Sequence, residues 1–172
     1  MNSFIITTQV LTDEQASAIN PKDLAVCDPN FVLEYFRLTA DKRLLFGGRC
    51  NYSGSDSEVI KEKLVPKMLR IYPQLASTKI DYAWSGKVAI PFNRVPQLGK
   101  ISSNVFYSQG YSGHGVNVTH LAGQIMADAV AGTIERFDVF ANIDKVIIPG
   151  AHRFSKQMVA LGVLYYQIKD RL

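Results

Sequence analysis

The sequence predicts an α+β fold: a mixed, largely antiparallel sheet flanked by helices. Several short segments are rich in β-branched and aromatic residues, and two of them are separated by a single polar turn, as in a hairpin. Other segments repeat their apolar residues at helical spacing. Strands and helices do not alternate regularly, which disfavours a parallel βαβ sheet. Because no repeat, low-complexity tract or linker interrupts the chain, we expect one compact unit.

The first third of the chain is predicted to be mainly β-structure. Residues 4–10 form a β-branched strand, and residues 12–29 are irregular except for one helical turn near 14–18. Residues 32–38 and 44–48 form a hairpin around a polar turn. The glycine pair that ends this hairpin indicates a sharp bend or the close approach of another group to the backbone.

The middle of the chain predicts a helix and then a strand. Apolar residues at helical spacing place the helix at about 56–72. Pro66 lies inside it and should kink it or loosen one turn, because proline lacks an amide proton and its ring clashes with the preceding turn. Residues 80–90 read as a strand, and the proline- and glycine-containing residues 91–99 read as a loop.

The last third predicts a strand, a glycine-rich turn and two helices. A strand at 105–109 leads into the turn at 110–115, and a helix of small apolar residues begins near Val116. Gly132 is the expected C-cap of that helix, because glycine readily adopts the left-handed conformation found there. A second helix is expected at 156–172.

Composition excludes several classes of function. Hydrophobic residues make up 47% of the 172 residues and charged residues 20%, as in ordinary globular proteins. The net charge is +4, but the basic residues are dispersed, so nucleic-acid binding is not expected and only non-specific attraction to an anionic polymer stays open. The cysteines and histidines show no metal-binding spacing, so no metal site is expected. No apolar run is long enough to span a membrane and no secretory signal is visible, so a cytoplasmic location is expected.

The segment Gly110-Tyr111-Ser112-Gly113-His114-Gly115 is the strongest candidate for chemistry. It joins a strand to a helix whose first amides and positive dipole end attract an anion, or a group that becomes one. On spacing alone, a tight turn without any ligand fits equally well. A P-loop does not fit, because the Gly-Lys-Ser/Thr ending is missing. His114 is either a hydrogen-bond donor to a ligand or a histidine whose bonds are satisfied within the turn.

Together with other segments, this turn resembles the FAD-dependent oxidoreductases of the D-amino-acid oxidase and sarcosine oxidase type. The turn and Val116 are similar to the family's late glycine motif. The residues 35–38 and 43–48 resemble its substrate-domain hairpin, and Trp84-Ser85-Gly86 with 96–99 resembles the stretch that returns to the flavin. The similarity covers essentially the whole chain and is greatest to a bacterial branch that acts on gamma-glutamylputrescine.

The resemblance implies an amine oxidoreductase with a flavin cofactor and assigns roles to residues. Gly110, Tyr111, Ser112, Gly113, Gly115, Val116 and Asn117 would bind FAD, and His114 would be catalytic. Tyr35, Arg37 and Trp84 would line the substrate site. Because Tyr35 and Arg37 are two residues apart on one strand, both should face the same side of the sheet. Aromatic residues on strands are also common in cores, so a packing role for these side chains stays open.

The chain departs from the family pattern in three respects. Asn117 replaces a lysine that holds the substrate carboxylate in sarcosine oxidases. Neither Cys27 nor Cys50 lies where some relatives attach flavin covalently, so FAD should be bound non-covalently. The GxGxxG turn that holds the FAD pyrophosphate is absent from the sequence.

We therefore expect a fragment of a longer enzyme. Residues 1–104 would be the substrate-domain part, and 105–172 the last strand, turn and helix of the flavin domain with the C-terminal helix. Without an N-terminal FAD-binding half as partner, the chain should be inactive. The alternative is a non-enzymatic orphan domain that covers its exposed apolar surface by self-association, so a homo-oligomer is expected.

Overall fold

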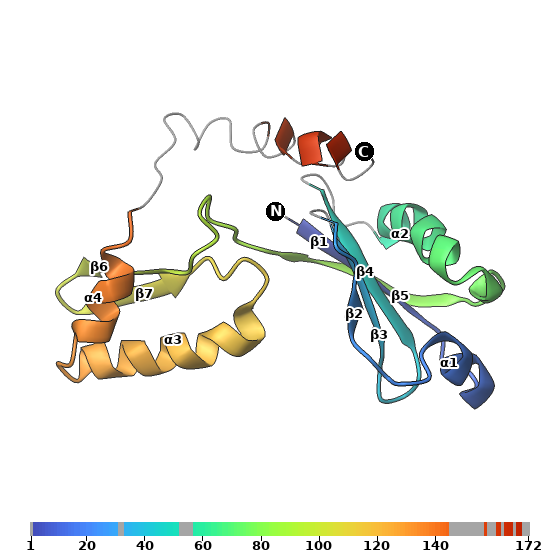
Figure 1. Ribbon diagram of the computed structural model, residues 1–172, viewed down its shortest axis with the longest axis horizontal. Coiled ribbons are helices and arrows are strands. Elements are labelled where there is room, and N and C mark those ends of the chain that lie inside the picture. The colour runs from blue at the N-terminus through green and yellow to red at the C-terminus, as the bar shows by residue number, and fades with distance from the viewer. Residues whose placement is uncertain are drawn as a thin grey trace. The chain divides into compact units, whose positions relative to one another are not determined.

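The computed structural model describes residues 2–30, 33–51 and 57–144, together with scattered residues between 157 and 169. The described residues form two compact units, one of Asn2–Lys87 and the other of residues 88–144 (Figure 1). Each unit has its own helices, antiparallel strands and buried core. The predicted α+β class is thereby confirmed. The assignment of 1–104 to a substrate domain and of 105–172 to a flavin domain stays a prediction.

The first unit is built on a five-stranded antiparallel sheet in the order β2-β3-β4-β1-β5 (Figure 1). Its strands are β1 (Asn2–Thr8), β2 (Val26–Cys27), β3 (Glu34–Leu38), β4 (Leu44–Asn51) and β5 (Ile80–Lys87). The predicted hairpin is β3 and β4. The first strand begins and ends two residues earlier than expected, and β5 ends at Lys87 rather than at 90.

One face of this sheet is covered by α2 (Ser57–Ile71). Alternate residues of β1, Phe4 and Ile6, are fully buried and belong to one cluster with Ile60 and Leu64 of that helix. Side chains alternate between the two faces of a strand, so Ile5, between Phe4 and Ile6, points to the opposite face of the sheet. We call this second face, on the side of Ile5, the open face. The helix continues through Pro66.

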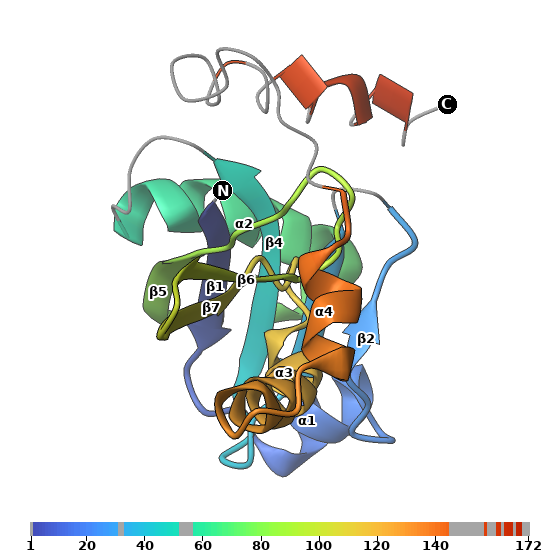
Figure 2. The ribbon, with the colours of Figure 1, turned by 90° about the vertical axis from the view of Figure 1, so that its left-hand side faces the viewer.

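The polar segment after β1 is more ordered than predicted. It contains α1 (Asp13–Ile19), a helix of two turns rather than one. The Thr12 hydroxyl accepts from the Gln15 amide at 3.2 Å, and the Gln15 side chain accepts from the Thr12 amide at 3.0 Å. This capping box, together with burial of Ala16 and Ile19, stabilises a helix that its polar composition concealed. A 3-10 turn, η1 (Pro73–Leu75), follows α2. Figure 2 shows α2 behind β1 and β4, two of the strands that it contacts.

The second unit contains the hairpin of β6 (Gln97–Ser102) and β7 (Val105–Gln109), followed by α3 (Gly115–Val130) and α4 (Glu135–Ala141). Its core consists of Leu98, Ile125, Ala129 and Phe137, one or two from each of β6, α3 and α4. Two parts of the prediction were wrong here. The loop at 91–99 extends too far, because β6 begins at Gln97, and α4 was not predicted at all.

The glycine predicted to end α3 is found at Gly132, although the C-cap residue itself is Ala131 and Gly132 follows it. Gly132 has φ +102°. Its amide donates to Ala129 O at 3.2 Å, and the Thr133 amide donates to Asp128 O at 2.9 Å. These two bonds make a Schellman motif. Most of the predicted helix at 156–172 lies outside the described residues, although those described there, such as Tyr165, are helical.

Candidate functional site

The glycine-rich turn bends through three residues with left-handed backbone angles. Gly110 has φ +77°, Ser112 +54° and Gly113 +90°. Glycine adopts such angles without a steric penalty, whereas serine does not, so Ser112 must be held by its surroundings. The chain then enters α3 at Gly115, with His114 as the N-cap residue. The predicted strand-turn-helix unit is therefore present, and its local geometry is what requires the glycines.

The turn is held against the segment that precedes β6. The Ser112 amide donates to Ala89 O at 3.1 Å, and the Ser112 hydroxyl donates to Arg94 O at 3.2 Å. Gly110 sits against Pro91, where a Cβ would come within 2.6 Å of the proline Cγ. These contacts compensate the strain at Ser112 and leave no room for a side chain at position 110.

Tyr111 and His114 contribute differently to the turn. The Tyr111 hydroxyl is hydrogen-bonded to Ser108 Oγ at 2.6 Å, so this side chain points back to β7. The His114 amide donates to Tyr111 O at 2.8 Å, which closes the turn. The His114 imidazole is exposed and makes no capping hydrogen bond to α3. Its ring is therefore available to an incoming group, as a donor to a ligand must be.

The amino end of α3 is accessible. Its first intrahelical bond runs from the Val118 amide to His114 O at 3.2 Å, so the amides of Gly115, Val116 and Asn117 precede it. The Val116 side chain is 92% exposed. A Cβ built on Gly113 would meet nothing within 4 Å. Backbone donors and the positive end of the helix dipole thus face open space within this unit.

The three predicted substrate residues lie on one face of the sheet in the first unit. Register places Tyr35, Gly47, Ile5 and Trp84 side by side on β3, β4, β1 and β5. Arg37 lies two residues further along β3 than Tyr35, and therefore on the same face. All belong to the open face, opposite the buried Phe4 and Ile6. Trp84 is 41% exposed, so it is not a core residue. Whether these residues bind substrate stays a prediction.

Tyr35 lies across the neighbouring strand instead of projecting from its own. A Cβ built on Gly47 would be 2.2 Å from Tyr35 Cε2, 2.3 Å from Cζ and 2.7 Å from the hydroxyl. The hydroxyl continues to β1, where it is hydrogen-bonded to Ser3 Oγ at 2.9 Å. The close approach predicted at the glycine pair is therefore real at Gly47. Ser3 was missed, because nothing in its sequence context indicates that a tyrosine reaches it.

The two arginines near the open face have different surroundings. Arg43 donates to Asp41 and Asp81 and lies over the Tyr82 ring, so its charge is neutralised locally. The neighbouring carboxylates raise its already high pKa further. Arg37 is exposed, and its Nε donates to Leu38 O at 3.1 Å. Among the described residues, Arg37 is therefore the guanidinium on this face without a carboxylate partner.

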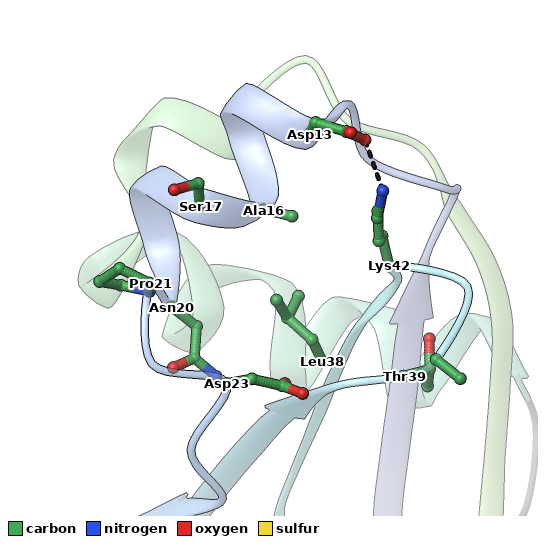
Figure 3. A pocket seen from close by; sticks show the side chains of 10 residues that line it. Asp13, Ala16, Ser17, Asn20, Pro21, Asp23, Leu38, Thr39 and Lys42 are labelled. Atoms are coloured by element: carbon green, nitrogen blue, oxygen red, sulfur yellow. Dashed lines mark hydrogen bonds and ion pairs between the residues drawn. The ribbon is translucent and has the colours of Figure 1, made fainter.

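An open pocket lies elsewhere in the first unit, between α1 and the β3–β4 turn (Figure 3). Asp13 and Lys42 face each other across its rim as an ion pair at 2.6 Å. None of the predicted site residues lines it. In the described part of the chain no group of His, Cys, Asp or Glu is arranged to hold a metal ion. None of the described helices is both long and apolar enough to cross a membrane.

Comparison with known families gives the site its context. Residues 1–129 match the profile of the family described as DAO, FAD dependent oxidoreductase. The match includes the open-face residues, the glycine-rich turn and most of α3. The chain belongs to this family. The resemblance inferred from the turn and the hairpin is thereby confirmed.

Relatives of this chain are considerably longer. It is 44% identical to gamma-glutamylputrescine oxidoreductase of Escherichia coli strain K12 over 98% of its own length and 39% of the relative's. It is 39% identical to a probable oxidoreductase, OrdL, of Haemophilus influenzae, over 99% of the chain and 39% of that protein. The chain therefore spans about two fifths of the length of the curated relatives it matches.

Solved structures agree with the fold of this family member. Iminodiacetate oxidase from Chelativorans sp. BNC1 superposes with a TM-score of 0.61 at 20% identity, covering 79% of this chain and 38% of that one. L-proline dehydrogenase from P. horikoshii gives a TM-score of 0.59 at 17% identity, covering 92% and 40%. At such low identity the likeness concerns the fold alone.

Proposed function

We propose that this chain supplies the substrate face and the last flavin-contacting elements of an FAD-dependent amine oxidoreductase. The substrate would be gamma-glutamylputrescine or another amine or amino acid. The observation that carries the proposal is the open face, where Tyr35, Arg37 and Trp84 come from two non-adjacent strands and still face the same side. A face with a phenol, an indole and an uncompensated guanidinium suits an amine with a hydrocarbon chain and an acidic end.

The glycine-rich turn fits the isoalloxazine part of FAD. Its backbone at Gly113 is open on one side, and no side chain stands within 4 Å of where a Cβ would be. The cofactor contacts would come from Gly110, Tyr111, Ser112, Gly113, Gly115, Val116 and Asn117. Bound non-covalently there, FAD would supply the acceptor for a hydride from the carbon next to the amine. The amides at the start of α3 would favour the negative charge that this reduction creates.

His114 is proposed as the catalytic residue of the turn. Its imidazole is exposed at the N-cap position of α3 and makes no capping bond. It would donate a hydrogen bond to the flavin or the substrate. Asn117 is exposed on the first turn of α3 and carries no charge. A neutral side chain there cannot attract a small carboxylate, which favours larger amines whose acidic group is bound elsewhere.

Residues outside these 172 would supply the pyrophosphate and ribose contacts. The sequence contains no GxGxxG turn, and the relatives extend well beyond the match. We therefore expect the purified chain to be colourless and without oxidase activity. The test is to titrate the chain with FAD, then to repeat the titration after joining it to the N-terminal FAD-binding part of a family member. A stoichiometric flavin spectrum from the chain alone would overturn this expectation.

The substrate proposal is tested in the flavin-loaded enzyme. With gamma-glutamylputrescine as substrate, Arg37→Ala and Trp84→Ala should each raise KM, because both side chains belong to the proposed binding face. Ser17→Ala on α1 is the control, since Ser17 is exposed and lies outside that face. Unchanged KM values in both variants would overturn the assignment of the open face.

Exposed apolar residues favour a second candidate function, that of a self-associating domain without catalysis. Val116 is 92% exposed, Val130 69% and Val139 67%, on α3 and α4. Exposed apolar surface of this kind would be covered if a second copy of the chain packed on it. Light scattering distinguishes the alternatives: a homo-oligomer is expected for the chain alone, and a concentration-independent monomer would contradict it.

A further inference from the structure

We infer that Ser3 is a positioning residue: it holds the Tyr35 hydroxyl so that the open face presents one O–H donor to an oxygen atom of the substrate. The inference rests on the proposed substrate role of Tyr35. Ser3 lies on β1 and belongs neither to the glycine-rich turn nor to the three predicted substrate residues, so its role is an addition to the proposed site.

The first support is the path of the Tyr35 side chain. Its Cε2, Cζ and hydroxyl oxygen all lie within 2.7 Å of where a Cβ on Gly47 would be. The outer half of the ring therefore occupies the side-chain position of residue 47. Tyr35 starts on β3 and its hydroxyl reaches Ser3 on β1, with β4 in between. Among the described residues, Ser3 is the hydrogen-bond partner that fixes the position of the Tyr35 hydroxyl, because Gly47 has no side chain to hold it.

The second support is the inventory of donors in the hydroxyl pair. Each hydroxyl has one hydrogen to donate and can accept from others. One of the two hydrogens is used in the 2.9 Å bond between Ser3 Oγ and the Tyr35 hydroxyl, and either oxygen can be its donor. Whichever way the bond is directed, one O–H remains. The pair therefore offers a single donor, which suits an acceptor such as an amide or carboxylate oxygen.

The third support is the open space beside the pair. Ser3 is paired with Gly86 on β5. A Cβ built on Gly86 would meet nothing within 4 Å. The strand next to Ser3 thus contributes no side chain that would cover the hydroxyl pair on this face. Ser3 and Tyr35 are both only partly buried, as a pair that meets a ligand must be.

A first experiment uses the 172-residue chain alone and needs no cofactor. The chain is labelled with ¹³Cζ-tyrosine, and the Tyr35 resonance is assigned by its loss in Tyr35→Phe. Ser3→Ala should shift that resonance, whereas Ser3→Thr, which keeps a hydroxyl, should leave it near its original position. Ser102→Ala is the matched control, because it also removes one serine hydrogen bond, at 3.0 Å to Asn104. An unmoved Tyr35 resonance in Ser3→Ala overturns the inference.

A second experiment uses the flavin-loaded enzyme that contains this chain, with gamma-glutamylputrescine as substrate. Loss of one neutral hydrogen bond predicts a rise in KM of about 3- to 10-fold for Ser3→Ala and for Tyr35→Phe. The double variant should show no further rise, because Ser3 acts only through the Tyr35 hydroxyl. Ser3→Thr should restore the original KM, and Ser102→Ala should not change it.

The possible outcomes distinguish the positioning role of Ser3 from the proposed substrate role of Tyr35. If Tyr35→Phe raises KM but Ser3→Ala does not, the positioning role of Ser3 is overturned and the substrate role of Tyr35 stands. If the rises in KM multiply in the double variant, Ser3 acts independently of Tyr35, which also overturns the inference. If Tyr35→Phe leaves KM unchanged, the substrate role of Tyr35 is overturned, and the inference with it.

Discussion

The Tyr35 ring occupies the volume in which any side chain at position 47 would stand. A Cβ on Gly47 would lie 2.2 Å from the nearest ring atom, closer than non-bonded carbons approach. The same arrangement recurs in the second unit, where a Cβ on Gly99 would lie 2.5 Å from the Tyr107 ring. In both hairpins a tyrosine covers a strand glycine and replaces the packing that the glycine lacks.

Gly47→Ala should therefore force Tyr35 out of its position. We expect a loss of about 1–3 kcal/mol in the free energy of unfolding, measured by urea denaturation, because the added methyl overpacks the site. Gly86→Ala is the matched control on the same sheet, since its Cβ would meet nothing within 4 Å. Equal stabilities for the two variants would show that the ring moves aside without cost.

Gly132→Ala and Gly123→Ala should change stability in opposite directions. Gly132 has φ +102° in the Schellman motif that ends α3, so alanine there should cost about 1–2 kcal/mol in the free energy of unfolding. Gly123 lies inside α3, where a Cβ meets nothing within 4 Å, so alanine should stabilise the helix by about 0.5–1 kcal/mol. Thermal or urea unfolding measures both, and a change of the same sign in both contradicts the assigned helix end.

Of the two cations that contact the buried carboxylate of Glu34, one should contribute far more than the other to the free energy of unfolding. The Glu34 side chain is 4% exposed, and its partners Lys67 and Arg70 are 25% and 70% exposed. Lys67→Met should cost about 3 kcal/mol in the free energy of unfolding, because it removes the nearer partner of a buried charge. Arg70→Met should cost about 0–1 kcal/mol, because its charge is largely hydrated. Similar losses in the two variants contradict this ranking.

Asp41 should contribute to acid sensitivity. The Thr39 hydroxyl, and then Arg43, hold the pKa of the Asp41 carboxyl below its ordinary value. A lowered pKa in the folded state means that the unfolded chain binds the proton more readily, so stability falls as pH drops from the ordinary aspartate pKa through the folded one. Asp41→Asn should flatten the change in melting temperature in that acidic range. Asp144→Asn is the control, because among the described residues its carboxylate has no ion pair.

The parts of the fold predicted correctly are those whose signals are local. The β3–β4 hairpin and α3 follow from residue types, spacing and the glycine at position 132. The helix α4 was missed because it is only seven residues long and is stabilised mainly by burial of Phe137 against the second core. The strand β6 was missed because Gly99 and the nearby proline read as a loop, whereas the Tyr107 ring fills the glycine's place.

The candidate site was predictable to a similar degree. The two-residue spacing of Tyr35 and Arg37 was enough to place both on one face, and the register of β1 and β5 adds Trp84. The glycine-rich turn was recognisable from its composition. The contacts that hold it, from Ser112 to Ala89 and Arg94, join residues 18 to 23 positions apart and leave no local pattern. For the same reason no sequence pattern pointed to Ser3.

Because the side chains of residues 35 and 47 would compete for the same volume, the two positions constrain each other in evolution and in protein engineering. The two positions should vary together among homologues: glycine should persist at 47 where 35 is a large aromatic, and larger side chains should become tolerable there when residue 35 shrinks. In a library that randomises only one of the two positions, most variants would have either a steric clash or a cavity at this place. Randomising both as a single unit is the route by which the surface of this sheet can be rebuilt.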